Sequence, residues 1–156
     1  MKVALVVPHV ENIGFNELCI PFGLLSIASY IHREIPDVQI KIFDGMIDSE
    51  VTDKLFKFQP SIVGVTATTA IINDAYKLGD MLRACRPDIL TVLGGVHASA
   101  LPNEAIKHFD VVVIGEGEKA FLQIYRTCHL IKKGVIINGE SVSDLNELPP
   151  LNYSLL

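Results

Sequence analysis

The chain has 156 residues, of which 49% are hydrophobic and 20% charged, and its formal net charge is −5. This length suits one domain with a sizeable core, and an acidic balance without a basic cluster argues against a nucleic-acid-binding surface. No apolar run reaches the roughly 20 residues that a membrane-spanning helix needs, so we expect a cytoplasmic protein. Its three cysteines form no CxxC or CxxxCxxC motif, so we expect no zinc or iron–sulfur site within this chain.

Apolar runs that are typical of strands alternate with amphipathic stretches that are typical of helices. The first run, KVALVV, is rich in β-branched residues, as expected of a strand buried on both faces. The stretch FGLLSIASYIHRE places Leu24, Ile27, Ala28 and Ile31 along one side of a helix. In chain order, the predicted strands are 2–7, 38–44, 61–67, 89–95 and 110–117, and the predicted helices are 22–34, 48–58, 69–86, 102–108 and 118–134.

This alternation predicts an α/β fold, a parallel sheet with helices on both faces. The simplest arrangement of five such strands is a Rossmann-like, doubly wound sheet with the flavodoxin-like order 2-1-3-4-5. Residues 135–142 contain an Asn-Gly turn between two apolar pairs, which indicates a small C-terminal hairpin or an extra edge strand. Residues 143–156 contain two prolines and no helical period. We therefore expect a domain at 1–142 followed by a linker at 143–156.

Three predicted strands end in small or polar residues: VTATTA at 65–70, VLGGVHAS at 92–99 and VVIGEGE at 112–118. Because ligands bind at the carboxyl ends of the strands in open α/β sheets, we expect these ends to form one rim that holds a large cofactor. Glycines let a ligand approach the backbone, and hydroxyls at a helix N-terminus favour phosphate or other acceptor groups. Such residues also make tight turns and helix caps. The candidates from this pattern are Thr66, Thr68, Thr69, Gly94, Gly95, Gly115 and Gly117.

The first loop, residues 8–21, is longer than the roughly 2–6 residues of a typical βα loop. A long loop at this position is typical of a lid or a binding loop. His9 opens the loop and His97 follows the double glycine, so both are candidates to face a ligand. Either histidine can instead be a packing or capping residue.

Several common nucleotide-binding motifs are missing. The first loop contains neither GxGxxG nor a P-loop, and PHVENIGF is not a hydroxyl- and glycine-rich phosphate loop of the flavodoxin kind. A phosphorelay receiver needs paired acids after the first strand and an Asp after the third, where this chain has Pro8-His9 and Thr66-Ala67.

The segments CIPFGLLSIASYI, PSIVGVTATTA, TVLGGVHASALPNEAI, FDVVVIGEGE and LNELPPLNYSLL together resemble the N-terminal cobalamin-binding domain of the cobalamin-dependent radical SAM enzymes. The resemblance implies that this chain binds cobalamin and presents it to a C-terminal radical SAM domain of the same polypeptide. That domain would hold a [4Fe–4S] cluster on a CxxxCxxC motif and cleave S-adenosylmethionine. The motif is absent here, so we expect a non-catalytic part of a methyltransferase.

In the wider cobalamin-binding fold, the nucleotide tail of the cofactor enters base-off between the sheet and the first helix. Small residues must line such a slot. Many of these proteins ligate cobalt through the His of a DxHxxG motif after the first strand, but Val7 and Asn12 replace the Asp and the Gly here, so the ligand role does not pass to His9. The resemblance assigns the slot and its borders to Gly64, Thr66, Ala67, Gly94, Gly95, Val96, His97, Gly115, Glu116 and Gly117.

Two other functions stay open on the sequence alone. The chain can be a regulatory or interaction domain of the same fold with an empty cofactor site. It can also be a small nucleotide- or phosphate-binding enzyme that uses the glycine loops.

Overall fold

The computed structural model describes residues 1–10 and 19–156. Within these residues one parallel sheet has the order β2-β1-β3-β4-β5-β6. The predicted α/β fold and the order of its first five strands are confirmed, and the segment at 135–142 supplies an extra edge strand, parallel to β5, rather than a hairpin. The strands are β1 (Lys2–Val7), β2 (Gln39–Asp44), β3 (Ile62–Thr66), β4 (Leu90–Gly94), β5 (Val111–Ile114) and β6 (Val135–Asn138).

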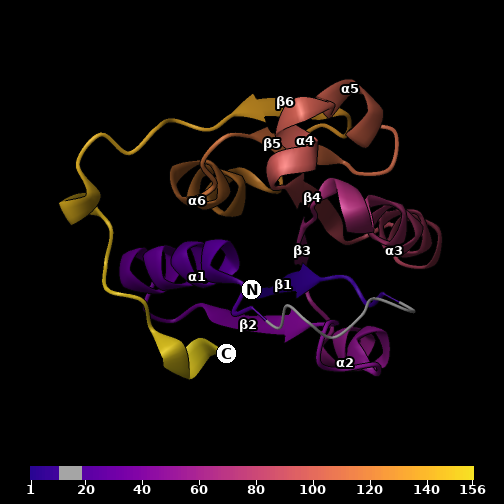
Figure 1. Cartoon of the computed structure of the whole chain (residues 1–156), viewed down its shortest axis with the longest axis horizontal. Coiled ribbons are helices and arrows are strands. Elements are labelled where there is room, and N and C mark those ends of the chain that lie inside the picture. Colours follow the sequence, from indigo (N-terminus) through magenta and orange to yellow (C-terminus); the bar gives the residue numbers. More distant parts are fainter. Residues whose placement is uncertain (11–18) are drawn as a thin grey trace.

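Helices cover both faces of the sheet (Figure 1). On one face, α1 (Phe22–Glu34) packs beside α6 (Glu118–Thr127), while α2 (Val51–Phe58) and α3 (Ile72–Cys85) lie on the other. None of the helices in the described residues has the length and apolar character that a membrane crossing requires. The remaining helical elements are the 3-10 turns η1 (Thr69–Ile71), η2 (Leu145–Glu147) and η3 (Tyr153–Leu155) and the short helices α4 (Val96–Ala100) and α5 (Pro102–Ala105).

Two helix predictions need correction. The last helix ends at Thr127 rather than at residue 134, so the chain has seven further residues in which to return to the edge of the sheet. The segment Val96–Ala100 forms α4, which was not predicted. This helix starts directly after Gly95, whose φ of 97° turns the chain sharply out of β4.

The register of the sheet decides which side chains face α1 and α6. Leu5 of β1 pairs with Gly64 of β3, and Gly64 pairs with Val92 of β4. Because successive side chains of a strand point to opposite faces, Gly64 and Thr66 share a face of β3. Phe121 of α6 lies over Gly64, so this is the face that α1 and α6 cover.

The C-terminal segment 143–156 runs along the outer side of α1 and α6 to the edge of the sheet at β2 (Figure 1). Leu151 and Leu155 pack against the hydrophobic core. The backbone N–H of Asn152 donates a hydrogen bond of 2.9 Å to the hydroxyl of Ser29, which lies on α1. The segment is therefore anchored to the domain at residues 151–155, and its role as a linker to a further domain stays a prediction.

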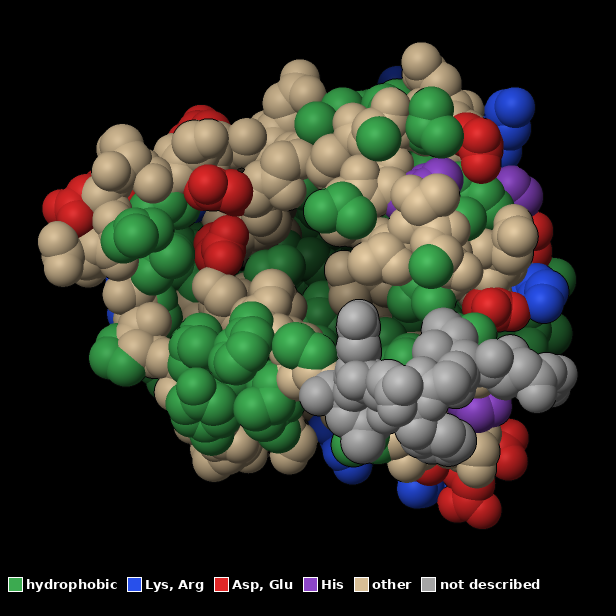
Figure 2. Space-filling view, viewed as in Figure 1, with side chains coloured by type: hydrophobic (Ala, Val, Ile, Leu, Met, Phe, Trp, Pro, Cys, Tyr) green, Lys and Arg blue, Asp and Glu red, His purple; other side chains and the backbone are tan. Residues whose placement is uncertain are grey.

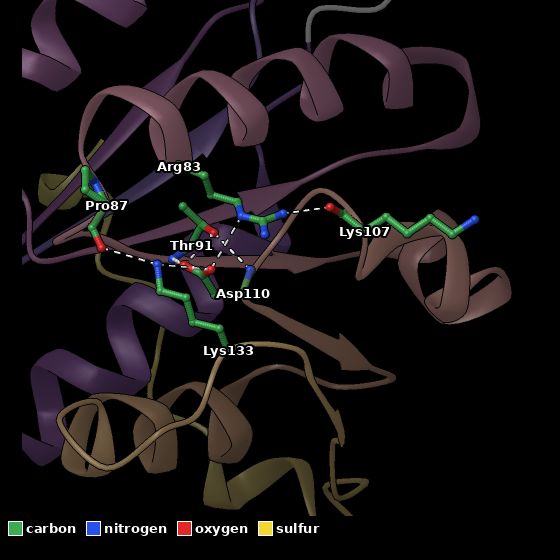
Figure 3. Close-up of polar contacts among 6 residues, drawn as sticks. All are labelled: Arg83, Pro87, Thr91, Lys107, Asp110 and Lys133. Atoms are coloured by element: carbon green, nitrogen blue, oxygen red, sulfur yellow. Dashed lines mark hydrogen bonds and ion pairs between the residues drawn. The ribbon is translucent and has the colours of Figure 1, made fainter.

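A buried carboxylate organises the amino edge of the sheet (Figure 3). Asp110, which immediately precedes β5, is fully buried, and its Oδ2 accepts hydrogen bonds from the backbone N–H (3.1 Å) and the hydroxyl (3.0 Å) of Thr91. Its Oδ1 lies 3.6 Å from Arg83 Nε and 3.4 Å from Lys133 Nζ. The cluster joins α3, β4, β5 and the segment that leads into β6, at the edge opposite the predicted rim.

Candidate functional site

A cavity of about 230 Å³ opens at the carboxyl edge of the sheet, between the central strands and the helix pair α1 and α6. Figure 2 shows a hollow at the centre of this face, with acidic side chains beside it. Residues of β1, β3, β4, β5, α1 and α6 line the cavity. This position is the predicted one, at the strand ends and beneath the first helix.

The deep walls of the cavity are apolar. Leu5, Val92 and Val113 line it from the sheet, and Leu24 and Phe121 line it from the two helices. Each of these five side chains is at most 4% exposed. The cavity is therefore an apolar slot, from which bound groups would exclude water.

Two glycines shape the slot in different ways. A methyl group built on Gly64 would lie 2.5 Å from Cε2 of Phe121 and 2.8 Å from Cδ2 of Leu5, so the missing side chain lets α6 approach the sheet. Within the described part of the chain, a methyl group built on Gly94 would meet no heavy atom within 4 Å. The missing side chain of Gly94 therefore leaves the slot open.

Polar side chains lie at the mouth of the slot. Glu118, at the start of α6, accepts a hydrogen bond of 2.6 Å at Oε1 from the hydroxyl of Ser26 on α1. Glu116 accepts a hydrogen bond of 2.5 Å at Oε2 from the backbone N–H of Val142. The backbone N–H of Gly115, a residue with a φ of 80°, donates to the hydroxyl of Ser99. These contacts hold the loop after β5 in place at the rim.

Just over half of the predicted site residues line this slot. The strand ends converge as expected, because the strands are parallel and adjacent. Whether these residues bind the cofactor stays a prediction. The predicted residues in the lining are Gly64, Thr66, Gly94, Gly95, Gly115, Glu116 and Gly117.

The other predicted residues lie outside the lining. Thr68 and Thr69 are exposed before α3, and Thr68 makes no side-chain capping bond. Ala67 is buried, whereas Val96 is 67% exposed at the rim. His9 is exposed, and its Nδ1 lies 2.9 Å from the carbonyl oxygen of Gly45. Most of the predicted lid, residues 11–18, lies outside the described residues.

His97 is the predicted residue whose surroundings differ most from expectation. It is 3% exposed and lies between Thr69, whose hydroxyl is 3.2 Å from Nδ1, and Tyr76, whose hydroxyl is 3.2 Å from Nε2. The hydroxyl of Tyr76 donates a hydrogen bond of 3.1 Å to Oε1 of Glu104. Both ring nitrogens of His97 are therefore engaged by hydroxyl groups within the chain. Burial raises the pKa of Tyr76 to about 12, and both the hydrogen bond that Tyr76 makes to Glu104 and the charge of Glu104 contribute to this shift.

Sequence reasoning did not predict the apolar walls of the slot as part of the site. Their pattern is that of a core stripe, and no local signal separates a helix packed on a sheet from one that leaves a slot. Among residues 1–10 and 19–156, no group of three or more His, Cys, Asp or Glu side chains is placed to hold a metal ion. The lining residues missed are Leu5, Gly23, Leu24, Ile27, Val65, Val92, Val113, Glu118 and Phe121.

Curated relatives include two methyltransferases. Over 136 residues, the chain is 32% identical to an uncharacterized methyltransferase of Pyrococcus horikoshii, a match that covers 80% of this chain and 28% of that protein. Over 110 residues, it is 34% identical to the bacteriochlorophyllide d C-8(2)-methyltransferase of Chlorobaculum tepidum, covering 70% of this chain and 24% of that protein. The chain thus spans only about a quarter of the length of these two relatives.

A solved structure shares the fold. A cobalamin-binding protein from Desulfitobacterium hafniense DCB-2 superposes with a TM-score of 0.56 at 15% identity, covering 80% of this chain and 57% of that protein. Residues 10–125, most of the chain and most of the slot, match the family model of the B12 binding domain. The chain therefore belongs to the family of B12-binding domains, and its cofactor is cobalamin.

Proposed function

We propose that the chain binds cobalamin base-off, with the nucleotide tail in the apolar slot, and presents the corrin to a catalytic domain. The observation that carries this proposal is the open slot at Gly94, which lies between the sheet and α1 at the edge where the glycine-rich strand ends meet. A ligand tail that enters there passes polar groups at the mouth and reaches apolar walls.

The residues present fit such a cofactor. The slot has a volume of about 230 Å³, which suits a tail rather than a macrocycle. The glycines at the ends of β4 and β5 place no side chains on the rim, so a flat ring can approach the backbone there. When bound, cobalamin supplies a cobalt centre that can carry a transferable methyl group. The residues of the chain hold the cofactor, orient it and keep water from its tail.

The proposal includes no cobalt ligand from the first loop. The DxHxxG motif is absent, and the described contact of the His9 ring is with the carbonyl oxygen of Gly45. We expect cobalamin bound by the His9→Ala variant to have the same absorption spectrum as cobalamin bound by the unaltered chain. A spectral change in that variant would assign a nitrogen ligand to His9 and overturn this part of the proposal.

The proposed partner is a radical SAM domain of the same polypeptide, which follows the segment 143–156 and uses a [4Fe–4S] cluster and S-adenosylmethionine for methyl transfer. The names of the two relatives and the small share of their length that the chain covers support a larger methyltransferase. The coding sequence downstream of Leu156 tests this: a CxxxCxxC motif within a few dozen residues supports the proposal, and a full coding sequence without one contradicts it.

Cofactor binding itself is tested with hydroxocobalamin. After incubation and desalting, we expect colour to stay with the protein, with the absorption spectrum of the base-off form. At a free concentration of one hundred times the dissociation constant, cobalamin should raise the free energy of unfolding by about 2.7 kcal/mol. Stabilisation by a panel of nucleotides, with none by cobalamin, would favour a nucleotide-binding enzyme instead.

A further inference from the structure

Among residues 1–10 and 19–156, the polar side chains that line the slot are confined to its mouth. The polar side chains that line it are those of Thr66, Glu116 and Glu118, all at or beyond the carboxyl ends of the strands. Both glutamates already accept a hydrogen bond within the chain, from the backbone of Val142 and from Ser26. Below them, the described lining consists of glycines and apolar side chains.

The tip of the cofactor's tail is a heterocyclic base, and different cobamides carry different bases. Benzimidazole and adenine share a five-membered ring but differ in the six-membered ring. In benzimidazole that ring contains only carbon, whereas in adenine it carries two nitrogen acceptors and an amino group with two donors. We propose that the apolar slot formed by Leu5, Val92, Val113, Leu24 and Phe121 selects cobamides with a benzimidazole base over those with an adenine base.

The physical reason is desolvation. Polar groups that leave water for an apolar site without finding a new hydrogen-bond partner lose binding free energy, and these five side chains have no group that can donate to or accept from a base. The six-membered ring of benzimidazole has no hydrogen-bond donor or acceptor that needs a partner, so its burial is favourable. This inference rests on the proposed function, since it requires the tail to occupy the slot.

The test compares three ligands on the same chain by equilibrium binding: cobalamin, the cobamide with adenine as its base, and cobinamide, which lacks the nucleotide tail. We expect the adenine form to bind at least about tenfold more weakly than cobalamin, and cobinamide to bind more weakly than cobalamin as well. Equal or tighter binding of the adenine form overturns the inference but leaves the proposed function intact. Failure of all three to bind overturns both, and cobinamide binding as tightly as cobalamin overturns the placement of the tail.

Adjacent residues of β5 provide a matched pair of variants. Val113 lines the slot, whereas Val112 is fully buried on the opposite face of the sheet. Val113→Thr adds a hydroxyl to the slot with almost no change in volume, and Val112→Thr adds the same group elsewhere in the core. We expect Val113→Thr to reduce the preference for cobalamin over the adenine form by several-fold and Val112→Thr to leave the ratio unchanged. Equal ratios in both variants and the unaltered chain would contradict the assignment of Val113.

Discussion

Phe121 of α6 packs directly on Gly64 in the centre of the sheet, and a methyl group on Gly64 would lie 2.5 Å from Cε2 of that ring. The absence of a side chain at this one position sets how closely α6 approaches β3. Phe121 in turn forms one wall of the slot, so the shape of the proposed cofactor site depends on this contact.

Replacing Gly64 with alanine should therefore destabilise the domain by overpacking. We expect Gly64→Ala to lower the free energy of unfolding by about 1–3 kcal/mol in urea denaturation. The cost should be smaller in a Phe121→Leu background, where the clashing ring is absent. As a control, Gly23→Ala lies in α1, and its new methyl group meets no atom of the described residues within 4 Å, so it should be neutral or slightly stabilising. The same cost of Gly64→Ala with and without Phe121 would refute this account.

The Asp110 cluster provides a stability prediction away from the proposed cofactor site. Asp110→Ala leaves the buried backbone N–H of Thr91 without its carboxylate partner and removes the counter-charge of Arg83 and Lys133. We expect a loss of about 1–3 kcal/mol in the free energy of unfolding and no loss of cobalamin affinity, because the cluster lies at the opposite edge of the sheet. Asp88→Ala, which removes an exposed ion pair with Arg86, is the control and should change the free energy of unfolding far less.

The raised pKa of Tyr76 predicts that the free energy of unfolding depends on pH in the alkaline range. Its pKa in the folded protein is raised from 10 to about 12, chiefly by burial, so the folded state keeps its proton where the unfolded state loses it. The stabilisation is complete below pH 10 and is lost as the pH rises towards 12, by about 1–3 kcal/mol in total. Urea denaturation at about pH 9 and about pH 11 should show a larger decrease for the unaltered chain than for Tyr76→Phe. Equal decreases would mean that Tyr76 titrates normally.

Replacing His97 with alanine tests whether this histidine beside the rim stabilises the fold or contacts the cofactor. Its two ring nitrogens are both engaged, with Thr69 and with Tyr76, so His97→Ala should lower the free energy of unfolding by about 1–3 kcal/mol. Cobalamin affinity, measured where the variant is fully folded, should change less than about threefold, which corresponds to under about 0.7 kcal/mol. A tenfold loss of affinity in a variant of normal stability would instead place His97 against the cofactor.

The fold was largely predictable because the apolar residues of most strands and helices have a spacing that is clearly typical of one or the other. The bounds of β1 and α1 agree with prediction, since KVALVV is a continuous buried run and Pro36 lies just beyond the apolar stripe of α1. The five-residue helix α4 was missed because it is too short to show a helical period. The last helix was predicted too long because apolar and basic residues continue after Thr127 without a stop signal before Gly134.

The site was only partly predictable, for a geometric reason. Strand ends in a parallel sheet meet at one edge, so glycines such as Gly94 were predictable from topology. The walls contributed by Leu24 and Phe121 depend on the distance between the helices and the sheet. That distance cannot be inferred from the spacing of apolar residues in the sequence. The direction in which His97 points was likewise decided by tertiary contacts with α3 and α5.

The central claim, that the slot receives the tail of cobalamin, is tested most directly at Gly94. A methyl group there would meet none of the atoms of residues 1–10 and 19–156 within 4 Å, so Gly94→Leu should fill the slot without unfolding the domain. Ala84→Leu, at an exposed position of α3, adds a comparable bulk on the other face of the sheet. In equilibrium titrations with hydroxocobalamin, we expect at least about a tenfold loss of affinity for Gly94→Leu and unchanged affinity for Ala84→Leu. A folded Gly94→Leu protein that binds cobalamin as tightly as the unaltered chain would contradict the account.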